Sequence, residues 1–218
     1  MAFTASTLGI VLWGLLGVLT ASLLNHLADR LPHHKPLRPG PFCPACAMPY
    51  APQRWLALPA LVTGRRRCNC GALLPARRWL FELVLGLAFA LLAWRRGFSW
   101  DLPMATFHLS ALALVTVTDL ETRRVPNAVV FPAAILTVAM TVMRCLACAP
   151  RVLLGGAIGL GLFFLLWAVY PKGMGFGDVK LAGYVGLIAG FPHVLSSLLM
   201  AILAGGVVAA LLLVTRRV

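Results

Sequence analysis

Two aspartates stand at the ends of apolar segments, where a pair of carboxylates could carry out acid–base chemistry. Asp119 closes one segment, in ALVTVTDLETRRVPN, and Asp178 opens another, in YPKGMGFGDVKLAGYVG. Ionisable groups at membrane depth are costly and usually face a bundle interior or a water-filled cavity. Two carboxylates that lie close together do not both ionise easily, so one keeps its proton at neutral pH. The charged one can then activate water while the neutral one donates to a carbonyl oxygen, which is the division of roles that amide hydrolysis needs.

Other interpretations of these two residues stay open. Asp178 could be a helix N-cap and Asp119 a solvated helix end. A divalent-metal site is less favoured, because no histidine neighbours either carboxylate. A small transporter or channel could use the pair as an ion or proton site, although such folds usually show paired halves with matching broken helices. Only one glycine-rich break is evident here. A scaffold in a secretion or pilus machine would tolerate loss of either aspartate.

Four further residues are candidates for positioning a substrate or a loop. Gly175 and Gly177 precede Asp178, where they would let the backbone approach a substrate or adopt positive φ. Lys180 points away from Asp178 on a helix and is interpreted as an interfacial anchor. Glu82 either faces the active cavity or turns to the interface to pair with Arg78 four residues away.

The composition requires a membrane. Of the 218 residues, 61% are hydrophobic and 11% are charged, and the mean hydropathy is +0.90. A soluble domain carries about a quarter charged residues, so the excess apolar surface must face lipid. The net charge of +13 is better explained by basic loops that set membrane topology than by nucleic-acid binding. No cleavable signal peptide is expected, because an uncharged first segment is long enough to span the bilayer.

The pattern of apolar segments predicts an all-α polytopic helix bundle with about seven transmembrane helices and a cysteine-rich cytoplasmic loop. The side that holds the loop at 26–78 carries fifteen Lys and Arg residues and the other side four, so the first side is expected to be cytoplasmic and the N-terminus outside. The expected spans are 4–25, 79–94, 102–118, 127–143, 152–170, 180–191 and 194–214.

Four cysteines in the cytoplasmic loop predict a metal site. Cys43 and Cys46 form a Cys-x-x-Cys pair, and Cys68 and Cys70 form a Cys-x-Cys pair. Two close pairs in a reducing compartment favour a structural zinc over disulfides, and the metal would hold together a loop that lacks a core. Free thiols are the alternative, and His33 and His34 could substitute as ligands. Cys145 and Cys148, near the outer end of the fourth span, are interpreted as small apolar packing residues rather than a local disulfide.

The motifs together resemble the type IV prepilin peptidases, a group of Gly-x-Gly-Asp intramembrane aspartyl peptidases. GMGFGDVKL at 173–181 is similar to their Gly-x-Gly-Asp signature, and DLETRRVPN at 119–127 to the segment around their first catalytic Asp. Upstream, the resemblance continues through a Ser-x-x-Asn followed by Arg-Leu-Pro, and through the end of a cysteine-bearing loop. These residues are Ser22, Asn25, Arg30, Leu31, Pro32, Cys70, Gly71, Ala72, Arg77 and Glu82.

The resemblance implies an activity. Asp119 and Asp178 would be the catalytic pair of an endopeptidase that cuts the basic leader of type IV prepilins or pseudopilins after a Gly, in the bacterial inner membrane. It also implies methylation of the new N-terminus with S-adenosylmethionine, for which the residues give no independent sign. The expected domains are 1–78, with the first helix, the loop and a region associated with methyl transfer, and 79–218, a six-helix peptidase domain.

Overall fold

The computed structural model describes residues 6–31, 41–43 and 45–214. This part of the chain is helical, with two isolated β-bridges in the cysteine-bearing loop as its extended pairings. The chain divides into two compact units, Met1–Arg123 and Arg124–Val218. Each unit is described by itself.

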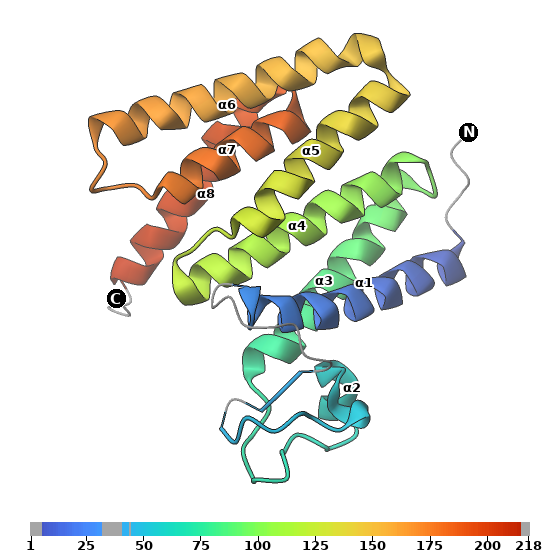
Figure 1. The fold of residues 1–218 in the computed structure, drawn as a ribbon. Coiled ribbons are helices and arrows are strands. Elements are labelled where there is room, and N and C mark those ends of the chain that lie inside the picture. The colour runs from blue at the N-terminus through green and yellow to red at the C-terminus, as the bar shows by residue number, and fades with distance from the viewer. Residues whose placement is uncertain (1–5, 32–40, 44, 215–218) are drawn as a thin grey trace. The chain divides into compact units, whose positions relative to one another are not determined.

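The first unit is built on three long helices, α1 (Thr7–Ala28), α3 (Ala76–Arg96) and α4 (Asp101–Thr122). Figure 1 shows α1 and α3 side by side. Small residues allow this approach, because a Cβ on Gly17 would lie 2.8 Å from the Cβ of Phe89. Apolar helices in a membrane associate through close packing of this kind rather than through a hydrophobic driving force. The α1–α3 pair therefore forms the base on which the cysteine-bearing loop sits.

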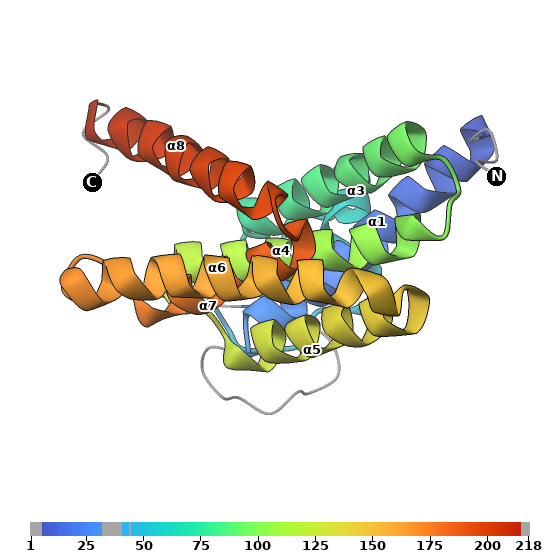
Figure 2. The ribbon, with the colours of Figure 1, turned by 90° about the horizontal axis from the view of Figure 1, so that it is seen from above.

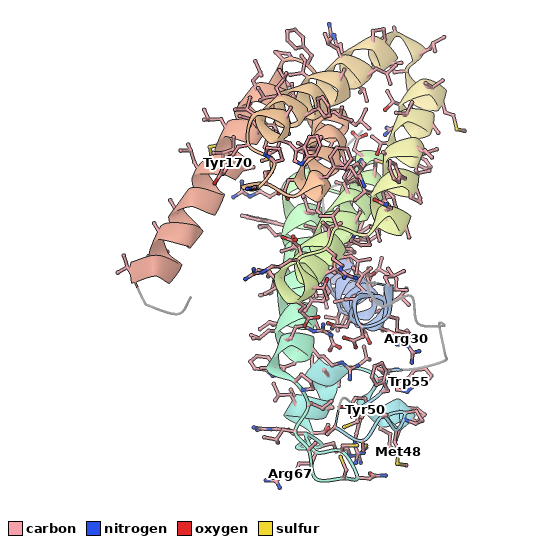
Figure 3. All side chains as sticks on the ribbon, turned by 60° about the vertical axis from the view of Figure 1, so that its left-hand side comes forward. Arg30, Met48, Tyr50, Trp55, Arg67 and Tyr170 are labelled. Atoms are coloured by element: carbon pink, nitrogen blue, oxygen red, sulfur yellow. A yellow bond between two sulfur atoms is a disulfide. The ribbon has the colours of Figure 1, made fainter. Side chains whose placement is uncertain are left out.

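The cysteine-bearing loop, here residues 41–75 without residue 44, has more structure than its composition predicts. It contains the one-turn η2 (Pro52–Arg54) and the short helix α2 (Ala57–Val62). One bridge joins Phe42 to Pro49 and the other joins Arg67 to Leu73, so that each cysteine pair lies inside a tight turn. A small buried cluster fills the centre of the loop: Cys43, Tyr50, Ala60, Cys68 and Leu74. Figure 3 shows Tyr50 and Trp55 nearer to Arg30, and Met48 and Arg67 at the far end of the loop.

The second unit consists of α5 (Asn127–Arg144), η3 (Leu146–Cys148), α6 (Ala149–Val169), α7 (Phe176–Ala189) and α8 (His193–Val214). Figure 2 shows α6 and α7 in close contact and α8 leading away from them to the C-terminus. Gly155 and Gly186 meet at the α6–α7 crossing, where a Cβ on Gly186 would lie 2.3 Å from the Gly155 carbonyl oxygen. These two glycines therefore allow the close packing of α6 on α7.

The all-helical fold class is confirmed, and every predicted span falls on one helix, with ends that differ by a few residues. Within the described residues, four helices are long and apolar enough to cross a membrane: α1, α4, α5 and the stretch Leu146–Val169 that contains α6. α3 carries charges near both ends, α7 has 14 residues, and the described apolar part of α8 is short. The number of seven spans therefore stays a prediction, as does the domain boundary at residue 78.

The interpretation of Cys145 and Cys148 as packing residues was wrong. They form a disulfide in the turn between α5 and α6, with Cα atoms 5.2 Å apart. The 3₁₀ turn at Leu146–Cys148 folds the backbone back on itself, which brings the two sulfur atoms within bonding distance despite only two intervening residues. The packing interpretation rested on the general tendency of free cysteines to be buried, which does not depend on the local backbone conformation that allows this disulfide.

Candidate active site and cysteine centre

Asp178 lies in the first turn of α7. Its backbone N–H donates to the carbonyl oxygen of Gly175, which is the N-cap residue. The N-cap position is thus held by Gly175 rather than by Asp178, whose side chain is half-buried. A carboxylate in the first turn is favoured by the positive end of the helix dipole.

Asp178 lines a pocket of about 350 Å³ within the second unit. The other lining residues come from α6, α7 and α8 and are apolar: Phe163, Leu181, Ala182, Val185, Leu198, Ala201, Ile202 and Gly205. A pocket of this size with one polar group among apolar side chains is typical of a site that holds an apolar ligand beside a reactive group.

The segment that leads into α5 packs against the first turn of α7. A Cβ on Gly177 would lie 2.8 Å from Cγ2 of Val125, so a larger residue would force the two segments apart. The ammonium group of Lys180 donates to Oδ1 of Asn127 at 2.9 Å and lies over the rings of Phe131 and Phe176. Val125 and Asn127 belong to the motif that begins at Asp119. The end of the first motif and the start of the second therefore meet inside one unit.

This arrangement changes the predicted roles of three residues. Gly175 has φ of −72°, and Gly177 is a helical residue, so neither adopts the positive φ that was one expectation. Gly177 is needed for the close approach of Val125 rather than for free backbone groups. Lys180 fixes α7 to the start of α5, a contact that its interpretation as an interfacial anchor did not include.

Asp119 lies in the last turn of α4, in the first unit, and its side chain is exposed. Its carbonyl oxygen accepts from the N–H of Arg123, which adopts a left-handed conformation with φ of 52° and ends the helix. The carboxylate is thus presented at a helix end. Because Asp119 and Asp178 belong to different units, their approach to each other stays a prediction.

The four loop cysteines converge. Their sulfur atoms all lie within 4.8 Å of one another, with Cys43 and Cys70 at 3.8 Å and Cys46 and Cys68 also at 3.8 Å. A tetrahedron with Zn–S bonds of about 2.3 Å has sulfur–sulfur edges of about 3.8 Å, so the cluster has the dimensions of such a site. The Cys-x-Cys pair is accommodated by a turn at Gly71, whose φ is 85° and whose N–H donates to the carbonyl of Cys68. His33 and His34 lie outside the described residues.

The thiols are not equivalent in charge. Burial alone raises the pKa of Cys43, but hydrogen bonds from the backbone N–H groups of Cys46 and Ala45 outweigh it and lower the pKa to about 6. At Cys46 the backbone N–H of Met48 lowers the pKa, while burial and the neighbouring thiols raise it to about 12. These shifts favour a thiolate at Cys43. A bound cation would allow the remaining thiols to ionise as well.

Comparison with known proteins agrees with both motifs. The model of the type IV leader peptidase family matches residues 104–210, and that of the bacterial peptidase A24 N-terminal domain matches residues 15–96. The chain belongs to the type IV leader peptidase family. The first of these matches contains both aspartates, and the second contains the four loop cysteines.

Curated relatives are named prepilin leader peptidase/N-methyltransferase. One from Bacillus subtilis is 26% identical over 203 residues, which is 92% of this chain and 82% of the relative. One from Stutzerimonas stutzeri is 28% identical over 73% of this chain, and one from Myxococcus xanthus is 28% identical over 91%. The chain spans 55% of the length of the Stutzerimonas relative and 61% of that from Myxococcus. No solved structure gives a significant match.

Two of the upstream residues that resemble the leader peptidase family join α1 to other parts of the first unit, one to the cysteine-bearing loop and one to α3. Ser22 donates to the carbonyl oxygen of Trp55 at 2.9 Å, and the buried Asn25 donates to that of Arg78 at 3.2 Å. Glu82, one of the candidates for positioning a substrate or a loop, contacts the cysteine-bearing loop. It is fully buried, and its carboxylate accepts the N–H groups of Ala57 and Leu58. The partners of Glu82 could not be predicted from the sequence, since they are backbone groups about 25 residues away.

Proposed function

We propose that the chain is a membrane-embedded aspartic endopeptidase that removes the basic leader of type IV prepilins or pseudopilins. Asp119 and Asp178 form its catalytic pair. The observation that carries this proposal is the packing of the two family motifs against each other, through Val125 with Gly177 and Asn127 with Lys180. This packing couples the chain that leaves Asp119 to the turn that bears Asp178.

The proposed reaction follows from the chemistry of a carboxylate pair. The ionised carboxylate takes a proton from a water molecule as that water attacks the scissile carbonyl carbon. The protonated carboxylate donates to the carbonyl oxygen, so that the tetrahedral intermediate carries no full negative charge. When the intermediate collapses, the first carboxyl gives the proton it took from water to the departing amine. The hydroxyl of the intermediate gives its proton back to the second carboxylate as the new carboxyl group forms. Which aspartate begins protonated is a property of the pair rather than of either residue.

The pocket beside Asp178 supports the choice of substrate. A prepilin joins a short basic leader to an apolar helix, so the bond that is cut lies next to apolar side chains. The pocket offers apolar walls and one carboxylate, which suits the apolar side of such a junction. We propose that the catalytic ends of the helices face the cytoplasm, where the fifteen basic residues lie and where the leader remains, and that the N-terminus lies outside the inner membrane.

We propose zinc as the metal of the cysteine centre, where it would hold the loop in its fold. Cys43, Cys46, Cys68 and Cys70 would be its ligands, and four thiolates leave no open position for catalysis. The proposed peptidase reaction therefore takes place without this metal.

Methyl transfer to the new N-terminus is the second proposed activity. The names of the relatives favour it, together with the family match over residues 15–96. The cofactor would be S-adenosylmethionine, and the described structure assigns no residues to it.

The experiment is cleavage of a prepilin with its leader by the protein in liposomes, with Asp119→Asn and Asp178→Asn as variants. Each variant is expected to lose cutting by at least about a thousandfold while keeping its helical content, because neither half of the acid–base pair can act alone. Cutting near the wild-type rate by either variant would exclude the pair and favour a transporter or scaffold.

A further inference from the structure

Arg77 joins the ends of three helices in the first unit. It lies in the first turn of α3, and one terminal nitrogen donates to Oδ1 of Asp29, the C-cap residue of α1. The other terminal nitrogen donates to Oε2 of Glu121 in the last turn of α4. The side chains of Arg77 and Asp29 are 23% exposed, so the bridge is partly shielded from water. Partial burial strengthens such contacts relative to those of a fully solvated pair.

The contact between Arg77 and Glu121 affects the position of Asp119, because Glu121 is two residues further along the same helical turn. Residues at i and i+2 point in different directions, so a hold on Glu121 leaves the Asp119 carboxylate unobstructed. The last turn of a helix frays unless it is anchored. In α4 the anchors are the Arg123 N–H on the Asp119 carbonyl and the Arg77 guanidinium on Glu121. Together they fix both the backbone and one side of the turn that presents Asp119.

We infer that Arg77 is a positioning residue for Asp119: it holds the end of α4 in register with α1 and α3 through Asp29 and Glu121. This inference rests on the proposed role of Asp119 in catalysis. An arginine is required because its planar fork donates to two carboxylates at once, whereas a lysine ammonium is a compact point charge on a flexible stem. Removal of the guanidinium would also leave two carboxylates without their shared cation.

The test compares Arg77→Gln and Arg77→Lys with wild type in the liposome cleavage assay, with kcat and KM measured separately. Arg77→Gln is expected to lower kcat by about tenfold to a hundredfold while KM changes less than about threefold, because a misplaced catalytic group slows chemistry more than binding. Arg77→Lys is expected to recover part of this loss. Arg66→Gln, in the exposed part of the loop, serves as the matched control and is expected to cut like wild type.

A double-mutant cycle separates positioning from general loss of stability. Glu121→Gln is expected to lower kcat by no more than Arg77→Gln does, because it leaves the ion pair of Arg77 with Asp29 in place. The double variant is expected to lose no more than Arg77→Gln, because that substitution already removes the ion pair with Glu121. Additive losses would overturn the inference, as would a wild-type kcat in Arg77→Gln or a rise in KM alone. If Arg77→Gln does not fold, Glu121→Gln and Arg77→Lys give the same comparison.

Asp119→Asn in the same assay distinguishes a failure of this inference from a failure of the proposed function. An inactive Asp119→Asn beside a fully active Arg77→Gln would overturn this inference and leave the proposed function standing. An active Asp119→Asn would remove the proposed function and the inference with it.

Discussion

Glu82 accepts the backbone N–H of Ala57 at 2.9 Å, although Glu82 is a fully buried residue of α3 and Ala57 begins the short helix α2. The second carboxylate oxygen accepts the next N–H, that of Leu58, at 2.7 Å. The first N–H groups of a helix have no partner within it, so the carboxylate satisfies two of them and meets the positive end of the helix. The carboxylate of Glu82 thereby fixes the start of α2, within the cysteine-bearing loop, to α3.

Replacement of Glu82 by Gln is expected to loosen the loop. The neutral amide has one acceptor oxygen where the carboxylate has two, so at least one buried N–H loses its partner, at a cost of about 1.5–3 kcal/mol. We expect faster alkylation of the loop cysteines and a lower melting temperature, measured by mass spectrometry and by thermal unfolding in detergent. Arg96→Gln, which removes an exposed charge at the other end of α3, is the control and is expected to behave like wild type. Unchanged alkylation in Glu82→Gln would contradict the proposed attachment.

Replacement of Gly177 by Ala is expected to damage the contact between the two motifs. The new Cβ would lie 2.8 Å from Cγ2 of Val125, and overpacking of this kind costs about 1–3 kcal/mol. Cleavage should fall together with stability, and Val125→Ala in the same chain should restore part of both. Gly161→Ala in α6 is the matched control, since a Cβ there meets no heavy atom within 4 Å. Equal effects of the two glycine substitutions would show that the contact with Val125 is unimportant.

One zinc ion per chain is expected in protein purified without chelator. Substitution of Cys43 or Cys68 by Ser should abolish zinc retention, because a site of this kind needs all four thiolates. Metal content can be measured by inductively coupled plasma mass spectrometry, with limited proteolysis of residues 41–75 as a second measurement. A chain with Ser at both 145 and 148 is the control and should keep its zinc. Retention of one zinc ion by the Cys43 variant would point to other ligands.

The two kinds of cysteine give a test of orientation. Cys145 and Cys148 form a disulfide, whereas Cys43, Cys46, Cys68 and Cys70 are free thiols. Disulfides persist in oxidising compartments, so the proposed topology places the first pair outside the inner membrane and the other four cysteines in the cytoplasm. In spheroplasts, an impermeant maleimide should label the disulfide pair only after reduction. It should reach the loop cysteines only after the membrane is permeabilised, once metal is removed. Labelling of the loop cysteines in intact cells would reverse the proposed topology.

The sequence predicted the helical class, the position of all seven long helices and the candidate residues Asp119 and Asp178. It could do so because the bilayer leaves few options: long apolar runs must become helices, and charges within them are few enough to be conspicuous. The same reasoning brought Cys43, Cys46, Cys68 and Cys70 together as one cluster, because thiols at these spacings in a reducing compartment favour a common metal.

The tertiary structure decided which groups contact one another. It showed that Glu82 holds the start of α2, that Gly177 makes room for Val125 and that Arg77 bridges Asp29 and Glu121. These contacts join residues 25 to 52 positions apart, or depend on backbone groups that carry no signature in the sequence. Local periodicity determines where a helix begins and ends. The partners of Glu82, Gly177 and Arg77 depend instead on how the helices pack, and on which polar groups would otherwise be buried without a hydrogen bond.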